Sequence, residues 1–233
     1  MNIKQNLTKT NFRTGKNRKI EYVAVHYTAG KKDYEGAAYD NTVYFKNVYR
    51  GASAHYFVDK SDTVWQCVED KNIAWHVGDK TVSSAKAPYY GKCTNSNSIG
   101  IEMVSFFTDG VYSISDETLC NTAKLCAFIL NKYNLGPDRL VCHYDVTGKL
   151  CPMPFVSNGR KNEMWDNFVC LVVKNMPEKF KDTENHWAKA YIDKLLEYGI
   201  VSGDGNGFFY PDKPVTRAEC AKMISNALLI LGK

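Results

Sequence analysis

The 233-residue sequence lacks the features that mark several special classes of protein. It has no uninterrupted apolar run approaching the about 18–20 residues that a membrane-spanning helix needs. Its first 19 residues are basic and polar and contain no apolar centre, so we expect no secretory signal there and synthesis in the cytoplasm. The remaining composition, with 44% hydrophobic and 24% charged residues, is ordinary for a globular protein.

Charge is also modest, because the net charge is only +5. Much of it lies near the N-terminus, in Lys4, Lys9, Arg13, Lys16, Arg18 and Lys19. A nucleic-acid-binding face usually has a higher basic density with aromatic residues interleaved. We therefore expect no nucleic-acid partner, whereas attraction to an anionic polymer such as a cell wall fits this charge equally well.

The eight cysteines include no Cys-x-x-Cys pair, which excludes a four-cysteine zinc knuckle. A chain made in a reducing compartment is not expected to carry a disulfide framework. Cys142 is predicted to point into the core. Cys151 differs from the others, because it follows a short strand and precedes two prolines.

Up to about residue 176 the pattern alternates between strand-like and helix-like segments. Strands are predicted within 20–27, 54–68 (a hairpin), 97–106 and 140–146, and helices within 37–50, 115–136 and 162–176. Ile99, Ile101 and Met103 share one face of their strand, so Glu102 lies on the opposite face. This alternation predicts an α/β domain built on one central sheet.

The pattern changes near residue 178. Two amphipathic helices follow, joined by a glycine-rich loop, and Trp187, Tyr191, Leu195 and Tyr198 form one stripe on the first. Thr216 and Glu219 match a capping box at the start of the second. We predict a catalytic domain over 1–174, a linker over 175–180 and a small all-α unit over 181–233.

Only five histidines are present, and His26 ends the first apolar strand. It is either a metal ligand or a structural histidine with its hydrogen bonds satisfied. His143 and Cys151 are eight residues apart, which suits a strand end and a return loop that converge on one ion. Two histidines and one cysteine would leave a fourth tetrahedral position open, as in catalytic zinc sites.

Several motifs occur in the order and approximate spacing of the type-2 N-acetylmuramoyl-L-alanine amidases, which the sequence resembles over residues 15–170. These motifs are "VHYTAG", "SAHYFVDKSDTVWQCV", "AWHVG", "NSIGIEMV" and "CHYDVTGKLCP". The family includes phage endolysins, bacterial autolysins and peptidoglycan recognition proteins. The resemblance implies a central mixed β-sheet flanked by helices, and one Zn²⁺ per chain held by His26, His143 and Cys151. It also implies cleavage of the amide between N-acetylmuramic acid and L-alanine.

The resemblance also suggests catalytic residues. Glu102 is the expected general base, because many members carry an acid there; others use a tyrosine where this chain has Ala54. Lys149 matches a lysine that stabilises the oxyanion. The plainer alternatives are a solvated strand residue for Glu102 and a loop charge for Lys149.

Three further polar residues match family positions without being expected ligands. His76 is predicted either to line the substrate groove or to have no such role. His55 is expected to be structural, and Asp145 to orient the loop of the site.

The segment from Phe180 onward resembles an S-layer homology repeat, a module that anchors proteins to secondary cell-wall polysaccharide. Arg217 is left free by the capping box, and its planar fork suits a carboxylate-bearing sugar, so we assign it to cell-wall binding. Trp187 is expected in the core. Such repeats usually pack in threes and this chain has one, which suggests a homotrimer formed through the repeat.

Together these features predict a zinc amidase anchored to the cell wall, as in a phage or prophage endolysin released by a holin. A host autolysin is the alternative origin. A peptidoglycan-binding protein without catalysis is the alternative class, although inactive relatives typically lack the cysteine ligand, which is present here.

Overall fold

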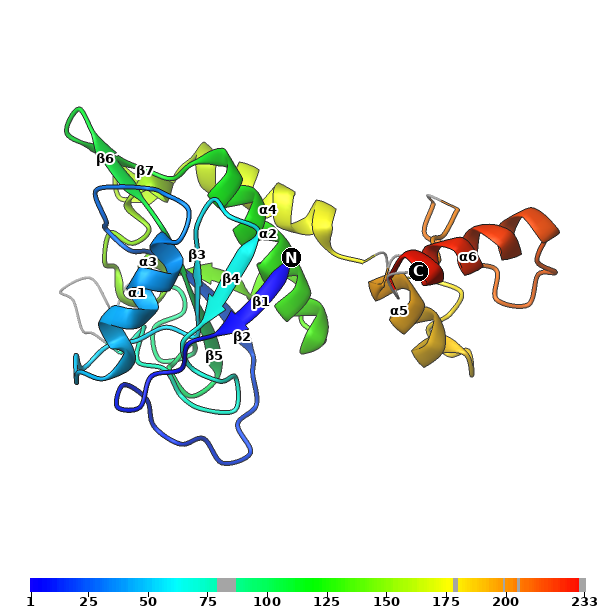
Figure 1. Cartoon of the computed structure of the whole chain (residues 1–233), viewed down its shortest axis with the longest axis horizontal. Helices are drawn as coiled ribbons and strands as arrows, with labels where there is room; N and C mark the ends of the chain where they lie inside the picture. Colours follow the sequence, from blue (N-terminus) through cyan, green and yellow to red (C-terminus); the bar gives the residue numbers. More distant parts are fainter. Residues whose placement is uncertain (79–86, 178–179, 199, 205, 231–233) are drawn as a thin grey trace. The chain divides into compact units, whose positions relative to one another are not determined.

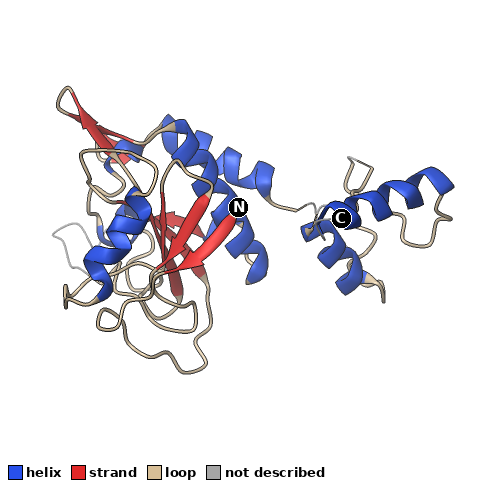
Figure 2. Ribbon diagram, in the orientation of Figure 1, coloured by secondary structure: helices blue, strands red, loops and turns tan. Residues whose placement is uncertain are grey.

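The computed structural model describes residues 1–78, 87–177, 180–198, 200–204 and 206–230. The chain divides into two compact units, Met1–Met176 and Pro177–Lys233 (Figures 1 and 2). Residues 178 and 179 of the predicted linker lie outside the described residues. Among the described helices, none combines the length and apolar character that crossing a bilayer requires.

The first unit is built on a six-stranded mixed sheet with the strand order β1-β4-β3-β5-β2-β8. Its strands are β1 (Asn2–Gln5), β2 (Tyr22–Tyr27), β3 (Tyr56–Val58), β4 (Thr63–Gln66), β5 (Ser98–Met103) and β8 (Leu140–Cys142). Only the β3–β4 hairpin is antiparallel; the other neighbours are parallel. Two small hairpins lie outside it, formed by β6 (Phe106–Thr108) with β7 (Val111–Ser113) and by β9 (Val156–Ser157) with β10 (Arg160–Lys161).

Helices cover both faces of this sheet (Figure 1). The helices of this unit are α1 (Ala37–Lys46), α2 (Asp116–Lys132), α3 (His143–Thr147) and α4 (Glu163–Asn175), with short 3₁₀ turns η2 (Pro137–Arg139) and η3 (Met153–Phe155). Ser115 caps α2, because its hydroxyl accepts a hydrogen bond from the Thr118 amide. The predicted α/β architecture is therefore confirmed.

Side-chain alternation along β2 decides which residues reach each face. Val23 and Val25 are fully buried in the main core, which α2 and α4 complete. Ala24 belongs to a smaller cluster on the opposite face, and His26 follows it two residues later. One face of β2 thus packs its valines into the main core, and the opposite face carries the polar side chain of His26.

One sequence prediction near this strand was wrong. The strand predicted over 140–146 ends at Cys142, and His143 begins α3 instead. The Asp145 side chain caps this helix by accepting a hydrogen bond from the Cys142 amide (3.1 Å). A carboxylate three residues after the strand end favours this turn into a helix.

The basic N-terminal segment packs on the first unit. β1 extends the sheet by pairing with β4. Arg18 donates hydrogen bonds to the carbonyls of Asn72 and Ser98, and its guanidinium lies 3.2 Å from His55 Nε2. Burial lowers the pKa of Arg18 to about 10. This arginine therefore joins the turn at Asn72 to the start of β5, which is far away in the sequence.

The second unit consists of α5 (Lys189–Glu197) and α6 (Arg217–Ile230), as predicted. Among the side chains that the structure describes in this unit, the buried apolar ones are Phe180, Ile192 and Val201. The prediction that Trp187 lies in the core was wrong, because 80% of its surface is exposed. The apolar stripe of α5 needs a further packed element to cover it, and a unit of two helices does not supply one. Tyr191 of the same stripe is likewise exposed.

Candidate metal centre

The centre forms where three neighbouring parallel strands end. In the sheet register, His26 at the end of β2 lies opposite Glu102 of β5, and Val25 lies opposite Cys142 of β8. His143 directly follows Cys142, so it reaches the same edge as His26. Because parallel strands end at one edge, residues more than a hundred positions apart meet here.

Cys151 reaches the centre through the return loop after α3. The Tyr144 amide donates a hydrogen bond to the Cys151 carbonyl (2.8 Å) and ties this loop to the start of the helix. Cys151 Sγ lies 3.7 Å from His26 Nδ1, and the two Nδ1 atoms of His26 and His143 lie 3.1 Å apart. All three side chains are buried, and their donor atoms lie within 4.8 Å of one another.

These separations fit a tetrahedral zinc site. Bonds of about 2.0–2.1 Å to nitrogen and about 2.3 Å to sulfur require nitrogens about 3.3 Å apart and nitrogen about 3.6 Å from sulfur. The observed 3.1 Å and 3.7 Å are close to two of the three edges, and all three donor atoms lie within 4.8 Å of one another. Two imidazoles and one thiolate are also a donor set that zinc prefers.

The surroundings keep His26 in the neutral form that binds metals. Burial lowers its pKa well below 6.5, and the neighbouring His143, His76 and Lys149 lower it further. A neutral imidazole keeps one nitrogen lone pair available for a ligand bond.

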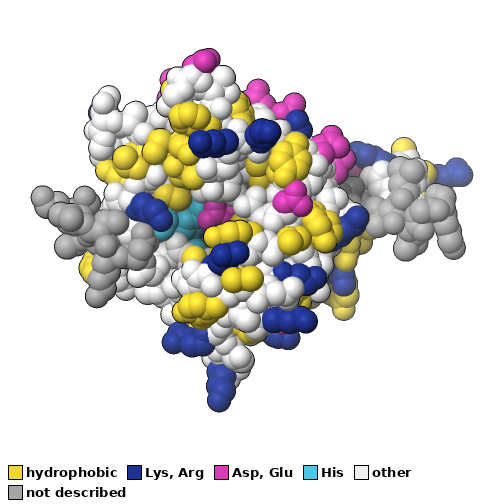
Figure 3. Space-filling view, turned by 60° about the vertical axis from the view of Figure 1, so that its left-hand side comes forward, with side chains coloured by type: hydrophobic (Ala, Val, Ile, Leu, Met, Phe, Trp, Pro, Cys, Tyr) yellow, Lys and Arg dark blue, Asp and Glu magenta, His cyan; other side chains and the backbone are white. Residues whose placement is uncertain are grey.

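Glu102 is half-buried beside these ligands. Burial raises the pKa of its carboxyl to about 8, and the Lys149 charge acts in the opposite direction. Its Oε2 is buried and has no hydrogen-bond partner among the described residues. Figure 3 shows histidine side chains beside an acidic side chain in a recess, with hydrophobic side chains around them.

Lys149 is exposed on the loop between α3 and Cys151. Its positive charge lowers the pKa of both His26 and Glu102, so Lys149 lies near the centre. Asp145 caps α3 and forms an ion pair with Lys161 (2.9 Å).

A second row of polar groups lies behind the candidate ligands, and the sequence motifs contain its histidines without indicating their contacts. His76 is buried, with its Nδ1 3.1 Å from His26 Nε2 and its Nε2 3.2 Å from Ser98 Oγ. His55 is buried as well and accepts a hydrogen bond from the Gly100 amide (2.9 Å). Since these residues come from separate loops and strands, no spacing rule connects them.

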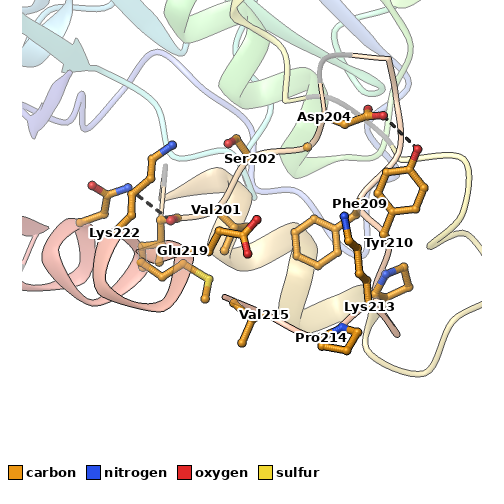
Figure 4. A pocket seen from close by; sticks show the side chains of 15 residues that line it. Val201, Ser202, Asp204, Phe209, Tyr210, Lys213, Pro214, Val215, Glu219 and Lys222 are labelled. Carbon is orange, nitrogen blue, oxygen red and sulfur yellow. Dashed lines mark hydrogen bonds between the residues drawn. The ribbon is translucent and has the colours of Figure 1, made fainter. Parts of the chain in front are cut away.

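In the second unit, Arg217 is exposed at the start of α6. The predicted capping box is present, since the Thr216 amide donates to Glu219 (2.8 Å) and the Glu219 amide donates to the Thr216 hydroxyl (3.2 Å). A cavity of about 510 Å³ lies nearby. Lys213 and Lys222 are among the residues that line it, and Arg217 is not (Figure 4).

Comparison with known proteins agrees with both units. Residues 16–154 match the N-acetylmuramoyl-L-alanine amidase family, and residues 179–221 match the S-layer homology domain. The amidase BlyA of Bacillus subtilis is 39% identical over 151 residues, covering 61% of this chain and 39% of its own length. The amidase CwlA of the same species is 28% identical over 217 residues, covering 91% of this chain and 72% of its own. The S-layer protein EA1 of Bacillus anthracis is 39% identical over 62 residues, which are 27% of this chain and 7% of EA1.

Solved structures show the same fold. A mutant endolysin from Bacillus subtilis superposes with a TM-score of 0.56 at 25% identity, covering 74% of this chain and 99% of that one. The catalytic domain of XlyA gives the same TM-score and coverage at 24% identity. The chain spans only about two fifths of the length of the curated relatives BlyA and CwlL.

Proposed function

The chain belongs to the N-acetylmuramoyl-L-alanine amidase family, and we propose that it hydrolyses the amide between N-acetylmuramic acid and L-alanine in peptidoglycan. The observation that carries this proposal is the convergence of His26, His143 and Cys151 within 4.8 Å, beside a carboxylate with an unpartnered oxygen. We assign this activity to residues 1–174.

His26 Nδ1, His143 Nδ1 and Cys151 Sγ would hold one Zn²⁺ per chain. When bound, zinc lowers the pKa of a water molecule and polarises a carbonyl. The three side chains arise from two strand ends and one tied loop, so the protein sets their positions in advance.

Glu102 is the proposed general base. Its Oε2 has no competing hydrogen bond within the described residues, so it is available to accept the proton of the attacking water. The same oxygen then delivers that proton to the leaving amine of L-alanine. The exposed Lys149 ammonium would stabilise negative charge on the carbonyl oxygen as it develops.

Residues 181–233 are proposed to anchor the protein to secondary cell-wall polysaccharide, with 175–180 as the linker. Arg217 is exposed and keeps its guanidinium outside the capping box, which leaves it able to bind a carboxylate-bearing sugar. Lys213 and Lys222 in the neighbouring cavity would favour the same anionic ligand.

A homotrimer through the repeat is proposed from its exposed apolar stripe. The exposed fractions are 80% for Trp187, 67% for Tyr191 and 53% for Tyr198. A second and third copy would cover these side chains and remove them from water. Sedimentation of the full chain tests this, and a monomer at micromolar concentration would refute it.

Release to the cell wall by a holin, as for a phage or prophage endolysin, stays a prediction. Both a phage lysin and a host autolysin would need the same chemistry, so origin does not alter the test of activity.

The decisive experiment digests purified peptidoglycan with the zinc-loaded protein and measures new L-alanine N-termini. Cys151→Ser is expected to lose both zinc and cleavage, whereas Cys120→Ser, at an exposed cysteine of α2, retains both. Zinc binding by the wild type without any new L-alanine N-termini would instead identify a non-catalytic peptidoglycan-binding protein.

A further inference from the structure

A chain of hydrogen bonds runs from the metal centre to a backbone carbonyl. His26 Nε2 lies 3.1 Å from His76 Nδ1, and His76 Nε2 lies 3.2 Å from Ser98 Oγ. The Ser98 hydroxyl lies 2.5 Å from the Thr94 carbonyl oxygen. Ser98 is fully buried, and His26 and His76 are buried as well.

The carbonyl at the far end fixes the direction of every bond in this chain. A carbonyl can only accept, so Ser98 donates its proton to Thr94. The Ser98 oxygen therefore accepts from His76 Nε2–H, which leaves His76 Nδ1 without a proton. His76 Nδ1 must then accept from His26 Nε2–H, because a neutral imidazole carries only one proton.

This order leaves His26 Nδ1 with its lone pair free. That atom is the one directed at His143 Nδ1 and Cys151 Sγ. We propose that His76 is a positioning residue, which holds the His26 proton on Nε2 and turns Nδ1 toward the metal. The proposal rests on the metal centre of the proposed function.

Two features hold the His76 ring in this place. The backbone amides of His76 and Val77 both donate to Asn95 Oδ1, at 2.9 and 2.8 Å. Gly100 of β5 lies directly against the ring, since a Cβ added there would stand 2.5 Å from His76 Cγ. The strand thus has no side chain at the one position where the imidazole needs room.

This placement gives His76 a role other than lining the substrate groove, which was one of the two alternatives left open by the sequence. Both ring nitrogens already have partners inside the protein. A ligand's remaining N–H usually has such a partner, which fixes the tautomer, and losing it typically weakens metal binding about 10–100-fold.

Two isosteric substitutions separate positioning from simple packing. His76→Asn places an amide oxygen near the position of Nδ1 and can still accept from His26, whereas His76→Gln places its polar atoms near Nε2 and cannot. We expect His76→Gln to weaken zinc binding about 10–100-fold in chelator competition. His76→Asn should stay within about threefold of the wild type, because the acceptor is retained.

The tautomer itself gives a readout that needs no metal. Long-range ¹H–¹⁵N NMR of the metal-free wild type should show His26 protonated on Nε2 alone, and His76→Gln should show a mixture. If His76→Gln does not fold, Ser98→Ala removes the end of the chain and should weaken zinc binding about tenfold.

The outcomes distinguish this inference from the proposed function. A wild type that binds no zinc would refute the metal centre, while the tautomer measurement would still test His76. Unchanged affinity and an unchanged His26 tautomer in both His76→Gln and Ser98→Ala would overturn the positioning role. A higher KM with unchanged zinc affinity would also overturn it and would favour contact with substrate.

Discussion

Replacing Glu102 by glutamine is expected to change stability and activity in opposite directions. Glutamine keeps the shape of the side chain but cannot ionise, so it removes only the charge. Burial raises the pKa of the Glu102 carboxyl from 4.5 to about 8 in the folded protein. A divalent cation at the neighbouring ligands would favour the carboxylate, so stability is compared in the metal-free protein.

The direction in which stability changes with pH depends on whether the folded or the unfolded protein holds the Glu102 proton. Between pH 4.5 and about 8 the folded protein retains a proton that the unfolded chain has released. The free energy of unfolding therefore falls as pH rises through this window. At about 1.4 kcal/mol per pH unit, the interval corresponds to a loss of about 5 kcal/mol at most, and relaxation around the carboxylate reduces this to about 2–5 kcal/mol.

Urea denaturation of the metal-free protein from pH 4.5 to 9 measures this difference. Glu102→Gln should be more stable than the wild type above pH 8, and the advantage should vanish near pH 4.5. Glu117→Gln, an exposed glutamate in the first turn of α2, is the matched control and should show no such trend. A Glu102→Gln advantage that is constant with pH would refute the buried, unpaired carboxylate.

The zinc-loaded variant tests the catalytic half of the reasoning. Loss of a general base typically lowers the rate about 10²–10⁴-fold. Zinc content should be unchanged, because Glu102 is not among the three ligands. Activity within about tenfold of the wild type would leave the amidase in place but assign the base to another group.

Three further outcomes follow from the first unit. Asp70→Asn should cost about 2–3 kcal/mol in urea denaturation at pH 7, because its side chain accepts hydrogen bonds from Tyr56, Gln66, Lys132 and Tyr133. Burial would raise the pKa of Asp70, but these partners outweigh it and lower the pKa below 3.8, so this contribution is lost as pH falls below 3.8. Arg18→Leu should lower stability by about 2–4 kcal/mol in the same assay by leaving two carbonyls unpaired, whereas the exposed Lys16→Leu should change it by less than about 0.5 kcal/mol. Removing zinc with a chelator should lower the melting temperature measured by calorimetry by about 8–16 °C, if zinc is present at about a thousand times its dissociation constant.

The sequence predicts the strands that carry this site better than it predicts the side-chain contacts within the site. Alternation of apolar residues places the strands and puts Glu102 opposite the face of Ile101. The ligand set depended on family resemblance, because spacing alone could connect only His143 with Cys151. The His76–Ser98 contact has no local signature, since the two residues lie 22 positions apart in separate motifs and only tertiary packing brings them together.

The exposure of Trp187 in the second unit was also mispredicted, because it too depends on tertiary packing. An amphipathic stripe shows which residues can be buried, but burial also needs a partner surface. In a unit with two helices, Phe180 and Ile192 fill the small core, and Trp187 is left outside it. Periodicity therefore identified the stripe correctly and could not say whether this chain covers it.

The inner and outer sides of the metal centre differ in how their polar atoms are satisfied. Behind the ligands, His76 and His55 have partners on both ring nitrogens. In front, Glu102 Oε2 is buried without a partner among the described residues. Leaving a buried oxygen unpaired costs free energy of about 1–3 kcal/mol, and such cost persists at places where a ligand completes the pairing. We therefore expect water and substrate to enter on the side of the unpartnered oxygen, and we expect the partnered histidines to hold the candidate ligands in position.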